Sequence, residues 1–483
     1  MAPFTCKRSF GLLLASLAFA SVSAQSTAVD WGAAQECNVI GEGNLRPRMA
    51  ILENGNPIVL WGRSSPPTNF VSTSTGDSFL PAVEVSMPGA APSVADWMGS
   101  SIATSGSASW VVMKTQPETS SPVYVRRSND GGLTWGDTIR VEPNDGRVAR
   151  FPTLIVTDPD APVVQYMQFD QGWAGARQVT TRMVGGAFST PVEVSAPFAP
   201  GEVCDCCPGQ LVGAGDRAVA LYRNAGSNIR VMYGAASQDG GATFPTGALL
   251  DETGWLLNAC PSSGPAGYMA GDSVRYVWMS GATNGSKTYI GSAHASDLSL
   301  GAQGLVHPGL TQAVTQNFPR IAGSNDTLGV VWQQTAGSQN EILFSWSVTG
   351  VNGLSVPDTV NVDLAGIQRT PDIAYANGAF HIIWSDMASA TVRYRKATLN
   401  AVVGVEERAY ASTLIWPNPV VDQARISGSG WSSAVITDLH GRTVMERSIR
   451  NGQVDLSTLA AGSYLMQLID GKQKQAPVRF EKR

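Results

Sequence analysis

Seven bulky aromatic residues recur along this chain at intervals of about 50 to 56 residues, and each closes a short apolar, strand-like run. Self-similarity at such a period is typical of solenoids, propellers and other repeat architectures. A repeat of this length has room for four short strands with their turns, which is one blade of a β-propeller. The seven residues are Trp61, Trp110, Tyr166, Tyr222, Trp278, Trp332 and Trp384.

The repeat therefore predicts an all-β propeller with seven blades, and six blades with a decorated end are the alternative. Its last unit stops after three strands, near Thr398, while an unassigned stretch at 26–40 precedes the first unit. We expect that stretch to supply the missing strand, because closing the ring leaves few bare strand edges. Six repeats also carry a proline 13 or 14 residues before the aromatic, namely Pro47, Pro152, Pro208, Pro265, Pro319 and Pro371.

The first 24 residues have the pattern of a secretory signal peptide. Lys7 and Arg8 precede an apolar run at 10–20, and small residues at 22–24 precede Gln25. No later segment has about 18 uninterrupted apolar residues, so we expect no transmembrane segment. The net charge of −5 gives no support for a nucleic-acid partner. The four histidines show no ligand spacing, so we expect neither a histidine metal site nor a cofactor.

Five cysteines follow the predicted signal peptide, and disulfides are the usual state of cysteines in exported proteins. Cys207 and Cys260 each precede a proline just before the innermost strand of consecutive blades, so we expect them to pair. A soft metal held by the cluster at 204–207 is the alternative. The odd count leaves one thiol unpaired. The five are Cys37, Cys204, Cys206, Cys207 and Cys260.

Two eight-residue segments, SNDGGLTW at 128–135 and SQDGGATF at 237–244, lie between predicted strands, and a weaker copy lies at 72–79. They resemble the Asp-box of sialidases and related propellers, which implies a sialidase-like propeller over residues 25–404. Short polar side chains accept backbone N–H groups in such a turn, and glycines adopt positive φ. We therefore expect a structural and not a chemical role for Ser128, Asp130, Gly132, Trp135, Ser237, Asp239, Gly241 and Phe244.

The composition changes after a polar linker at 405–412. Four landmarks follow within residues 413–483: IWPNP at 415–419, ITDLHGR at 436–442, VDLSTLAAGSY at 454–464 and FEKR at 480–483. In this order they resemble the type A C-terminal sorting domain of the type IX secretion system. The resemblance implies a bacterium of the Bacteroidota, export by the type IX machinery, and a final location on the outer surface or in the medium. By its strands alone the tail is a small β-sandwich, and a carbohydrate-binding or Ig-like appendage is the alternative.

Arginines recur where the innermost strands of several blades are expected to begin. Arg46, Arg150 and Arg369 lie 15 or 16 residues before the blade aromatic, and Arg48 and Arg320 lie slightly further along. Two of these positions resemble the Arg-x-Pro motif of the sialidase first blade, where an arginine helps to hold the substrate carboxylate. Guanidinium suits that task because its planar donors meet a carboxylate two at a time. The alternative is that these arginines only tie one blade to the next.

The resemblance to sialidases also implies an acid catalyst near the first blades, and Asp96 is placed for that role. A simple turn residue is the alternative, and the sequence singles out no tyrosine-glutamate pair for the nucleophile. We therefore predict first a secreted propeller that binds an extracellular glycan or surface polymer. An exo-acting glycoside hydrolase of the sialidase type is the second hypothesis, and a purely adhesive scaffold is the third.

Overall fold

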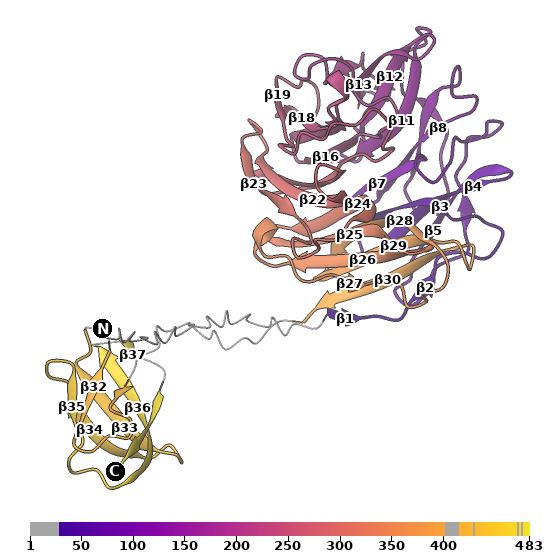
Figure 1. The fold of residues 1–483 in the computed structure, drawn as a ribbon. Coiled ribbons are helices and arrows are strands. Elements are labelled where there is room, and N and C mark those ends of the chain that lie inside the picture. The colour runs from indigo at the N-terminus through magenta and orange to yellow at the C-terminus, as the bar shows by residue number, and fades with distance from the viewer. Residues whose placement is uncertain (1–28, 401–414, 428–429, 471–472, 475–476) are drawn as a thin grey trace, which may run out of the picture. The chain divides into compact units, whose positions relative to one another are not determined.

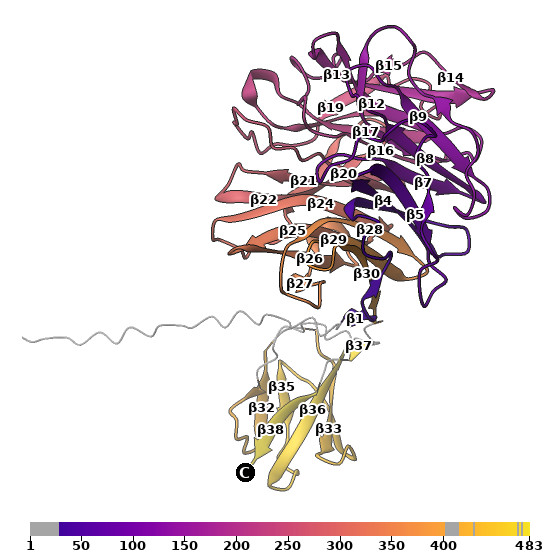
Figure 2. The same ribbon diagram turned by 90° about the vertical axis from the view of Figure 1, so that its right-hand side faces the viewer.

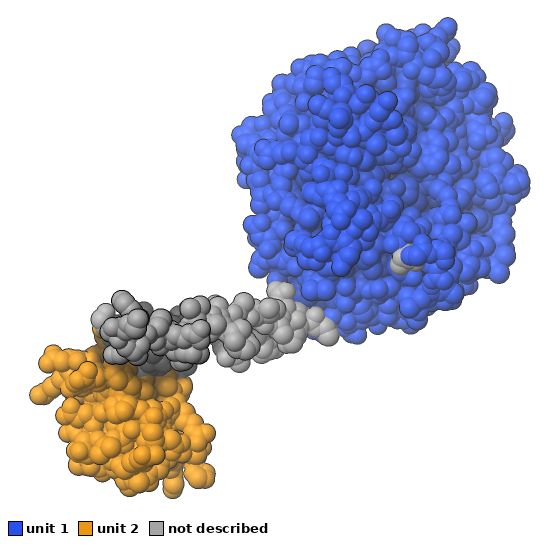
Figure 3. Space-filling view, in the orientation of Figure 1, with its two compact units in different colours: residues 1–401 blue, residues 402–483 orange. Residues whose placement is uncertain are grey.

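The computed structural model describes residues 29–400, 415–427, 430–470, 473–474 and 477–483. The predicted signal peptide at 1–24 and the predicted linker at 405–412 lie outside these ranges. The chain divides into two compact units, Met1–Ala401 and Val402–Arg483, which Figure 3 colours separately. In the described part of the chain, no helix is long and apolar enough to cross a membrane.

The first unit is a propeller whose antiparallel sheets are arranged around a ring, with β16 (Gln210–Ala214), β24 (Val314–Ser324) and β28 (Gln368–Ala376) toward its middle (Figure 1). The strands of each blade are given from the middle outwards. Blade one consists of β3 (Leu45–Ile51), β4 (Pro57–Ser64), β5 (Pro67–Thr73) and β6 (Val83–Glu84), and blade two of β7 (Ser101–Ser105), β8 (Ala108–Lys114), β9 (Val123–Ser128) and β10 (Ile139–Arg140). Blade three consists of β11 (Val148–Ile155), β12 (Val163–Asp170) and β13 (Ala174–Val184), with β14 (Ala187–Phe188) and β15 (Val192–Glu193) paired to β13.

The next three blades repeat this order. Blade four consists of β16 (Gln210–Ala214), β17 (Arg217–Arg223), β18 (Met232–Ser237) and β19 (Thr246–Leu249). Blade five consists of β20 (Ala266–Ala270), β21 (Ser273–Ser280), β22 (Gly285–His294) and β23 (Leu300–Leu305), and blade six of β24 (Val314–Ser324), β25 (Thr327–Ala336), β26 (Gln339–Ser347) and β27 (Asp358–Thr359). Two short 3₁₀ helices, η1 (Gly226–Asn228) and η2 (Gly350–Asn352), lie in connecting loops.

The seventh blade is assembled from both ends of the propeller sequence. Its strands are β28 (Gln368–Ala376), β29 (Ala379–Asp386) and β30 (Thr391–Leu399), completed by β1 (Val29–Trp31) and β2 (Gln35–Glu36) from the N-terminal side. Val29 pairs with Leu399 and Gln35 with Tyr394. Innermost strands contact each other in order around the ring, and β28 contacts β3. The expected closing strand is therefore confirmed, and the ring has seven blades.

All seven repeating aromatics lie in the second strand of their blades and are at most 2 % exposed. These strands are buried almost end to end, because both faces of each one pack against neighbouring blades. Continuous apolar runs are typical of strands covered on both faces. This packing explains why the period was so clear in the sequence.

Four of the repeating prolines lie inside innermost strands, and each marks a break in strand register. The residue before each proline has a positive φ, which a non-glycine residue adopts only at a cost of about 1–3 kcal/mol. Such bulges redirect the neighbouring side chains and are common beside binding sites. The four residues are Arg46, Phe151, Phe318 and Thr370.

The two eight-residue segments form the expected hairpin turns, which we call the box turns (128–135 and 237–244). In the first, the amide of Gly132 donates to Ser128 Oγ at 2.9 Å, and the amide of Thr134 donates to Asp130 Oδ1 at 2.9 Å. A Cβ added to Gly132 would lie 2.6 Å from Ile58 Cδ1 of blade one. The second turn repeats these bonds and packs on blade three in the same way. Each box turn thus ties its blade to the preceding one.

The second unit is a small β-sandwich. One sheet is β31 (Ile415–Trp416), β32 (Gln423–Ile426) and β35 (Gln453–Asp455); the other is β34 (Thr443–Ser448), β33 (Ser433–Asp438), β36 (Gly462–Asp470), β37 (Gln473–Lys474) and β38 (Val478–Lys482). Both sheets contribute to one apolar core, with Ile426, Val454, Met466 and Phe480 among its buried members. Figure 2 shows the two sheets facing each other. The predicted sandwich is confirmed.

Candidate functional site

Several innermost strands begin on one face of the ring, and the loop at 85–100 lies over this face. Three contacts fix the loop to different blades. The carbonyl of Gly99 accepts a bond of 3.1 Å from Arg46 Nη1 of blade one, and Asp96 forms an ion pair with Arg369 of blade seven. Trp97 packs edge-on against Phe151 of blade three, with ring centroids 5.5 Å apart. The loop therefore brings Asp96 to the mouth of the ring.

Below this loop lies the inner cluster, which consists of Arg46, Arg48, Arg320 and Asp372. Arg320 Nε lies 2.6 Å from Asp372 Oδ1, and its Nη1 donates to Gln210 Oε1 of blade four at 2.9 Å. The other oxygen of Asp372 accepts the amide of Met49 at 2.9 Å. The side chain of Asp372 is only 4 % exposed. One buried carboxylate thus faces three arginines from blades one and six.

Arg46 and Arg48 have few partners of their own. Arg48 is buried and donates to the carbonyl of Pro47 at 2.6 Å. Among the described residues, no carboxylate lies within ion-pair distance of either guanidinium. Burial, followed by the charge of Arg320, lowers the pKa of Arg46 to about 10. Burial and the charges of Arg46 and Arg320 also lower the pKa of Arg48. The inner cluster holds more positive charge than it neutralises, which is costly away from water.

Two further ion pairs, the rim pairs, lie at the mouth: Arg369 with Asp96, and Arg150 with Glu118. Arg150 Nε is 2.9 Å from Glu118 Oε2. The Arg150 guanidinium carbon also lies 4.5 to 5.2 Å from the ring centroids of Phe151, Trp97 and Trp173. Burial lowers the pKa of Arg150, while the charges of Glu118 and Asp205 oppose that shift. Cation–π contacts and the carboxylate together hold this arginine in place.

The sequence predicted equivalent positions for Arg46, Arg150 and Arg369, and the bulges show that Arg46 is not equivalent to the other two. Arg150 and Arg369 lie two residues before their prolines, whereas Arg46 lies one residue before Pro47 and itself has the positive φ. Arg48 and Arg320 are truly equivalent, because both directly follow a bulge proline, and Asp372 occupies the same position in blade seven. Alignment on the prolines would therefore have revealed Asp372, which alignment on the aromatics missed. No comparable signal marks Glu118, Gln210 or Trp173, which come from loops or strand ends of other blades.

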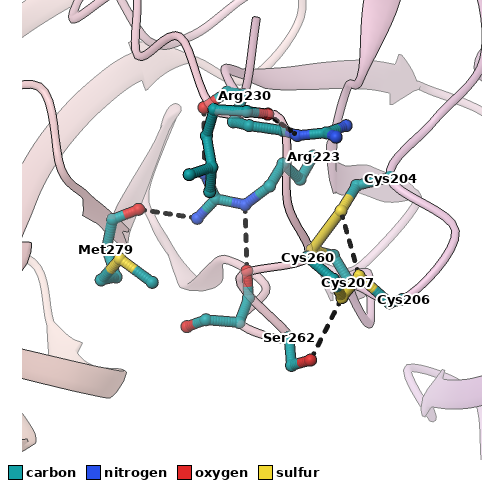
Figure 4. The surroundings of a disulfide bond; sticks show 10 residues. Cys204, Cys206, Cys207, Arg223, Arg230, Cys260, Ser262 and Met279 are labelled. Atoms are coloured by element: carbon teal, nitrogen blue, oxygen red, sulfur yellow. Dashed lines mark hydrogen bonds between the residues drawn. A yellow bond between two sulfur atoms is a disulfide. The ribbon is translucent and has the colours of Figure 1, made fainter. Parts of the chain in front are cut away.

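The cysteines join blades four and five, but with a different pairing from the one expected. Cys204 pairs with Cys207, and Cys206 pairs with Cys260 (Figure 4). The predicted Cys207–Cys260 bridge is wrong because 204–207 forms a tight turn, in which the amide of Cys207 donates to the carbonyl of Cys204. That turn leaves Cys206 to meet Cys260, with their Cα atoms 6.2 Å apart.

The last of the five cysteines that follow the predicted signal peptide, Cys37, is buried and forms no disulfide with any described residue, and burial raises the pKa of its thiol. The sulfur atoms of Cys204, Cys206 and Cys207 lie within 4.8 Å of one another. Such spacing would suit a soft metal if the cysteines were reduced. In this structure, disulfides engage all three.

In the described part of the chain, no tyrosine hydroxyl is hydrogen-bonded to a glutamate, the pairing expected for a sialidase nucleophile. Buried tyrosines such as Tyr222 and Tyr276 instead donate to backbone carbonyls that follow the outermost strand of the preceding blade. Asp96 does lie at the mouth, and its catalytic role stays a prediction.

Comparisons with known proteins identify the second unit. Residues 414–478 match the family described as the secretion system C-terminal sorting domain. The chain thus carries a sorting domain of the type IX secretion system, which directs export to the cell surface or the medium. No curated protein matches the sequence.

Solved structures similar to the chain include propeller enzymes. The α-L-arabinofuranosidase of Fusarium graminearum in complex with arabinobiose is 12% identical, with 77% of this chain and 98% of that one covered and a TM-score of 0.43. An ulvan lyase of polysaccharide lyase family 25 is 9% identical, with coverages of 76% and 95% and a TM-score of 0.48. Trypanosoma rangeli sialidase is 7% identical, with coverages of 93% and 89% and a TM-score of 0.43. The propeller fold itself rests on the strand pairing described above.

Proposed function

We propose that this exported propeller binds the anionic groups of an extracellular glycan or surface polymer at the mouth of its ring. The inner cluster supports this function, since Arg320 pairs with Asp372 while no described carboxylate lies within ion-pair distance of Arg46 or Arg48. A bound carboxylate or sulfate would supply the missing negative charge. Guanidinium groups bind such oxyanions through paired N–H donors, and the half-buried setting strengthens the attraction.

The rim pairs complete the proposed site. Arg369 and Arg150 are each balanced by a carboxylate, so they add little net charge, and they position the loop at 85–100 and the aromatic rings above the inner cluster. Under this proposal Arg46, Arg48 and Arg320 contact the anionic group, while Arg150 and Arg369 line its approach.

The proposal includes the route by which the protein reaches its ligand. We infer that residues 1–24 are a signal peptide, that 25–404 form the mature binding domain, and that 413–483 are recognised by the type IX machinery of a member of the Bacteroidota. The separate core of the second unit supports this division. Truncation after residue 404 should leave a folded propeller that stays in the periplasm. Normal appearance of the truncated protein in the medium, on immunoblots, would contradict the sorting role.

Ligand binding can be tested by calorimetry of residues 25–404 with N-acetylneuraminic acid, galacturonic acid and sulfated galactose, alongside the corresponding neutral methyl esters or galactose. We expect at least one acid to bind and its neutral partner to fail. Arg48→Lys should weaken binding at least tenfold, because an ammonium group cannot form the paired contact. Arg182→Lys is the matched control, since Arg182 donates to the Asp239 carbonyl at a box turn. Equal effects of both variants, or no preference for acids, would overturn the proposal.

An exo-acting glycoside hydrolase is the second candidate, and the location of Asp96 beside Arg369 at the mouth favours it. Turnover of a fluorogenic sialoside by the wild type, lost in Asp96→Asn, would support this activity. A purely adhesive scaffold is the third candidate. It predicts that all sugars fail while the propeller still binds whole cells or matrix.

A further inference from the structure

A cleft of about 370 Å³ lies between blades two and three, directly beside the mouth. Its walls come from the β8–β9 loop, the β10–β11 loop and the β12–β13 loop. Glu118 and Trp173 belong to this lining and also contact Arg150 at the rim. A ligand held at the mouth can therefore extend into the cleft without leaving the protein surface. The volume lies within the range of small-molecule pockets, roughly 300–1,000 Å³.

Trp173 is the most unusual residue of the cleft. It lies at the tip of the β12–β13 hairpin, is 39 % exposed and has a φ of +66°. A bulky residue in this region of φ is strained, and strain of this kind is common at ligand-binding positions. Phe169 supports its ring edge-on, with centroids 5.1 Å apart. The indole is thus a fixed, partly exposed aromatic surface, which can pack against the apolar face of a sugar ring.

The polar groups of the cleft differ from those of the inner cluster, because their charges are nearly balanced. Arg140 lies 3.4 Å from Glu142, and Arg147 lies 3.1 Å from Asp145. Lys114 is buried and donates to the carbonyl of Ser121. Glu118 has one oxygen on Arg150, while no described group donates to the other. Such a lining favours the hydroxyl groups of an uncharged sugar over a second anion.

Another cleft, of about 650 Å³, lies between blades six and seven and lacks these features. Its aromatic residue, Trp384, is 2 % exposed and donates to Gln368 at 2.8 Å. Gln368 and Arg393 in turn lie within hydrogen-bond distance of Asp386. These polar side chains of the larger cleft are hydrogen-bonded to one another, so the size of a cleft alone does not mark a ligand site.

We propose that the cleft between blades two and three is a second sugar subsite, in which an uncharged sugar packs on Trp173. The proposal rests on the proposed function, because the first sugar is the anionic one held at the mouth. Together the two subsites select an acidic oligosaccharide of at least two residues over a free acidic monosaccharide. The uncharged sugar is the direct neighbour of the anionic one, since the cleft and the mouth share Glu118 and Trp173.

The experiment uses calorimetry on residues 25–404 and two pairs of sugars. The first pair is N-acetylneuraminic acid and 3′-sialyllactose, and the second is galacturonic acid and a disaccharide in which galacturonic acid is β-linked to galactose. Wild type should bind the disaccharide or trisaccharide of one pair on the order of tenfold more tightly than its monosaccharide. Trp173→Ala should abolish this gain, so that the longer sugar binds no more tightly than its monosaccharide, while Trp173→Phe should retain most of the gain. Trp97→Ala is the control, because Trp97 contacts Arg150 at a similar distance but does not line the cleft.

The possible results separate the two proposals. Equal affinity of wild type for both members of a pair would overturn the subsite and leave the anion site standing. Equal losses for monosaccharide and longer sugar in Trp173→Ala, matching those in Trp97→Ala, would show that Trp173 only supports Arg150. If wild type binds no member of either pair, both the proposed function and the subsite fail.

Discussion

The box turns and the inner cluster are both built from polar and charged side chains, yet they use their hydrogen-bonding capacity in opposite ways. Asp130 accepts bonds from Ser128, Leu133 and Thr134, all within its own turn. Arg48, with five N–H donors, makes one hydrogen bond among the described residues, to the adjacent carbonyl of Pro47. A satisfied polar network stabilises a fold, whereas a guanidinium with few acceptors from the protein calls for an explanation.

This contrast separates the polar groups that stabilise the fold from those that we propose to bind a ligand. The box turns also pack closely on the preceding blade, as the contact of Gly132 with Ile58 shows. The inner cluster lies instead where four strands carry strained residues before their prolines. The free energy of unfolding can test this contrast. Removing a stabilising group should lower it, whereas removing an uncompensated charge should leave it unchanged or raise it.

The largest effect is expected for Asp372→Asn, which removes the one carboxylate of the inner cluster. Three arginines would then lack a counter-charge, and the free energy of unfolding should fall by about 3–5 kcal/mol. Urea titration measures this loss. Sulfate should restore part of it, since an anion that binds only the native state stabilises it by mass action. Sodium chloride at equal ionic strength is the control, and equal recovery in both salts would show that no specific anion replaces Asp372.

A smaller effect is expected at low pH from His381, a buried residue of β29 that is hydrogen-bonded to Tyr394 at 2.8 Å. Burial, followed by the charge of Lys396, lowers its pKa to about 4. Between pH 6.5 and 4 the unfolded chain therefore binds a proton that the native protein excludes, so stability falls as the pH falls. We expect a loss of about 1–3 kcal/mol, measured by urea titration at several pH values, that is absent in His381→Asn. If the free energies of unfolding of wild type and His381→Asn fell in parallel with pH, His381 would not be the group responsible for the loss.

Ser128→Ala tests the stabilising side of the contrast. Ser128 is buried, accepts the amide of Gly132 and donates to Asp130 at 2.7 Å. Its loss should lower the free energy of unfolding by about 1–2 kcal/mol, while sugar affinity stays unchanged. Ser237→Ala in the second box turn makes the equivalent change and should have a matching effect. A change in sugar affinity would mean that the box turns influence the mouth.

The features that the sequence predicted well are those set by local or periodic contacts. The blade aromatics are buried at the same position of each blade, so their period revealed the fold. The hydrogen bonds of each box turn close within eight residues, so their pattern could be read directly. The closing strand followed from counting strands in the last repeat.

The features that were mispredicted or missed depend on shifts of one residue or on distant contacts. Adjacent Cys206 and Cys207 cannot be distinguished by spacing, and only the turn at 204–207 decides which one reaches Cys260. The bulges displace Arg46 by one position relative to Arg150. Asp96 meets Arg369 across 273 residues of sequence. No local pattern encodes such a pairing.

Arg48→Met tests the other side of the contrast and should change stability least. Methionine can fill the space of the arginine stem and removes a buried charge that no described carboxylate pairs. Replacing buried charges by apolar groups of similar volume is often neutral or stabilising, so the free energy of unfolding should stay unchanged or rise by about 1 kcal/mol. Affinity for an acidic sugar and the stabilisation by sulfate should both be lost. A marked loss of stability in urea, with affinity retained, would make Arg48 a tie between blades and assign the inner cluster to the same structural class as the box turns.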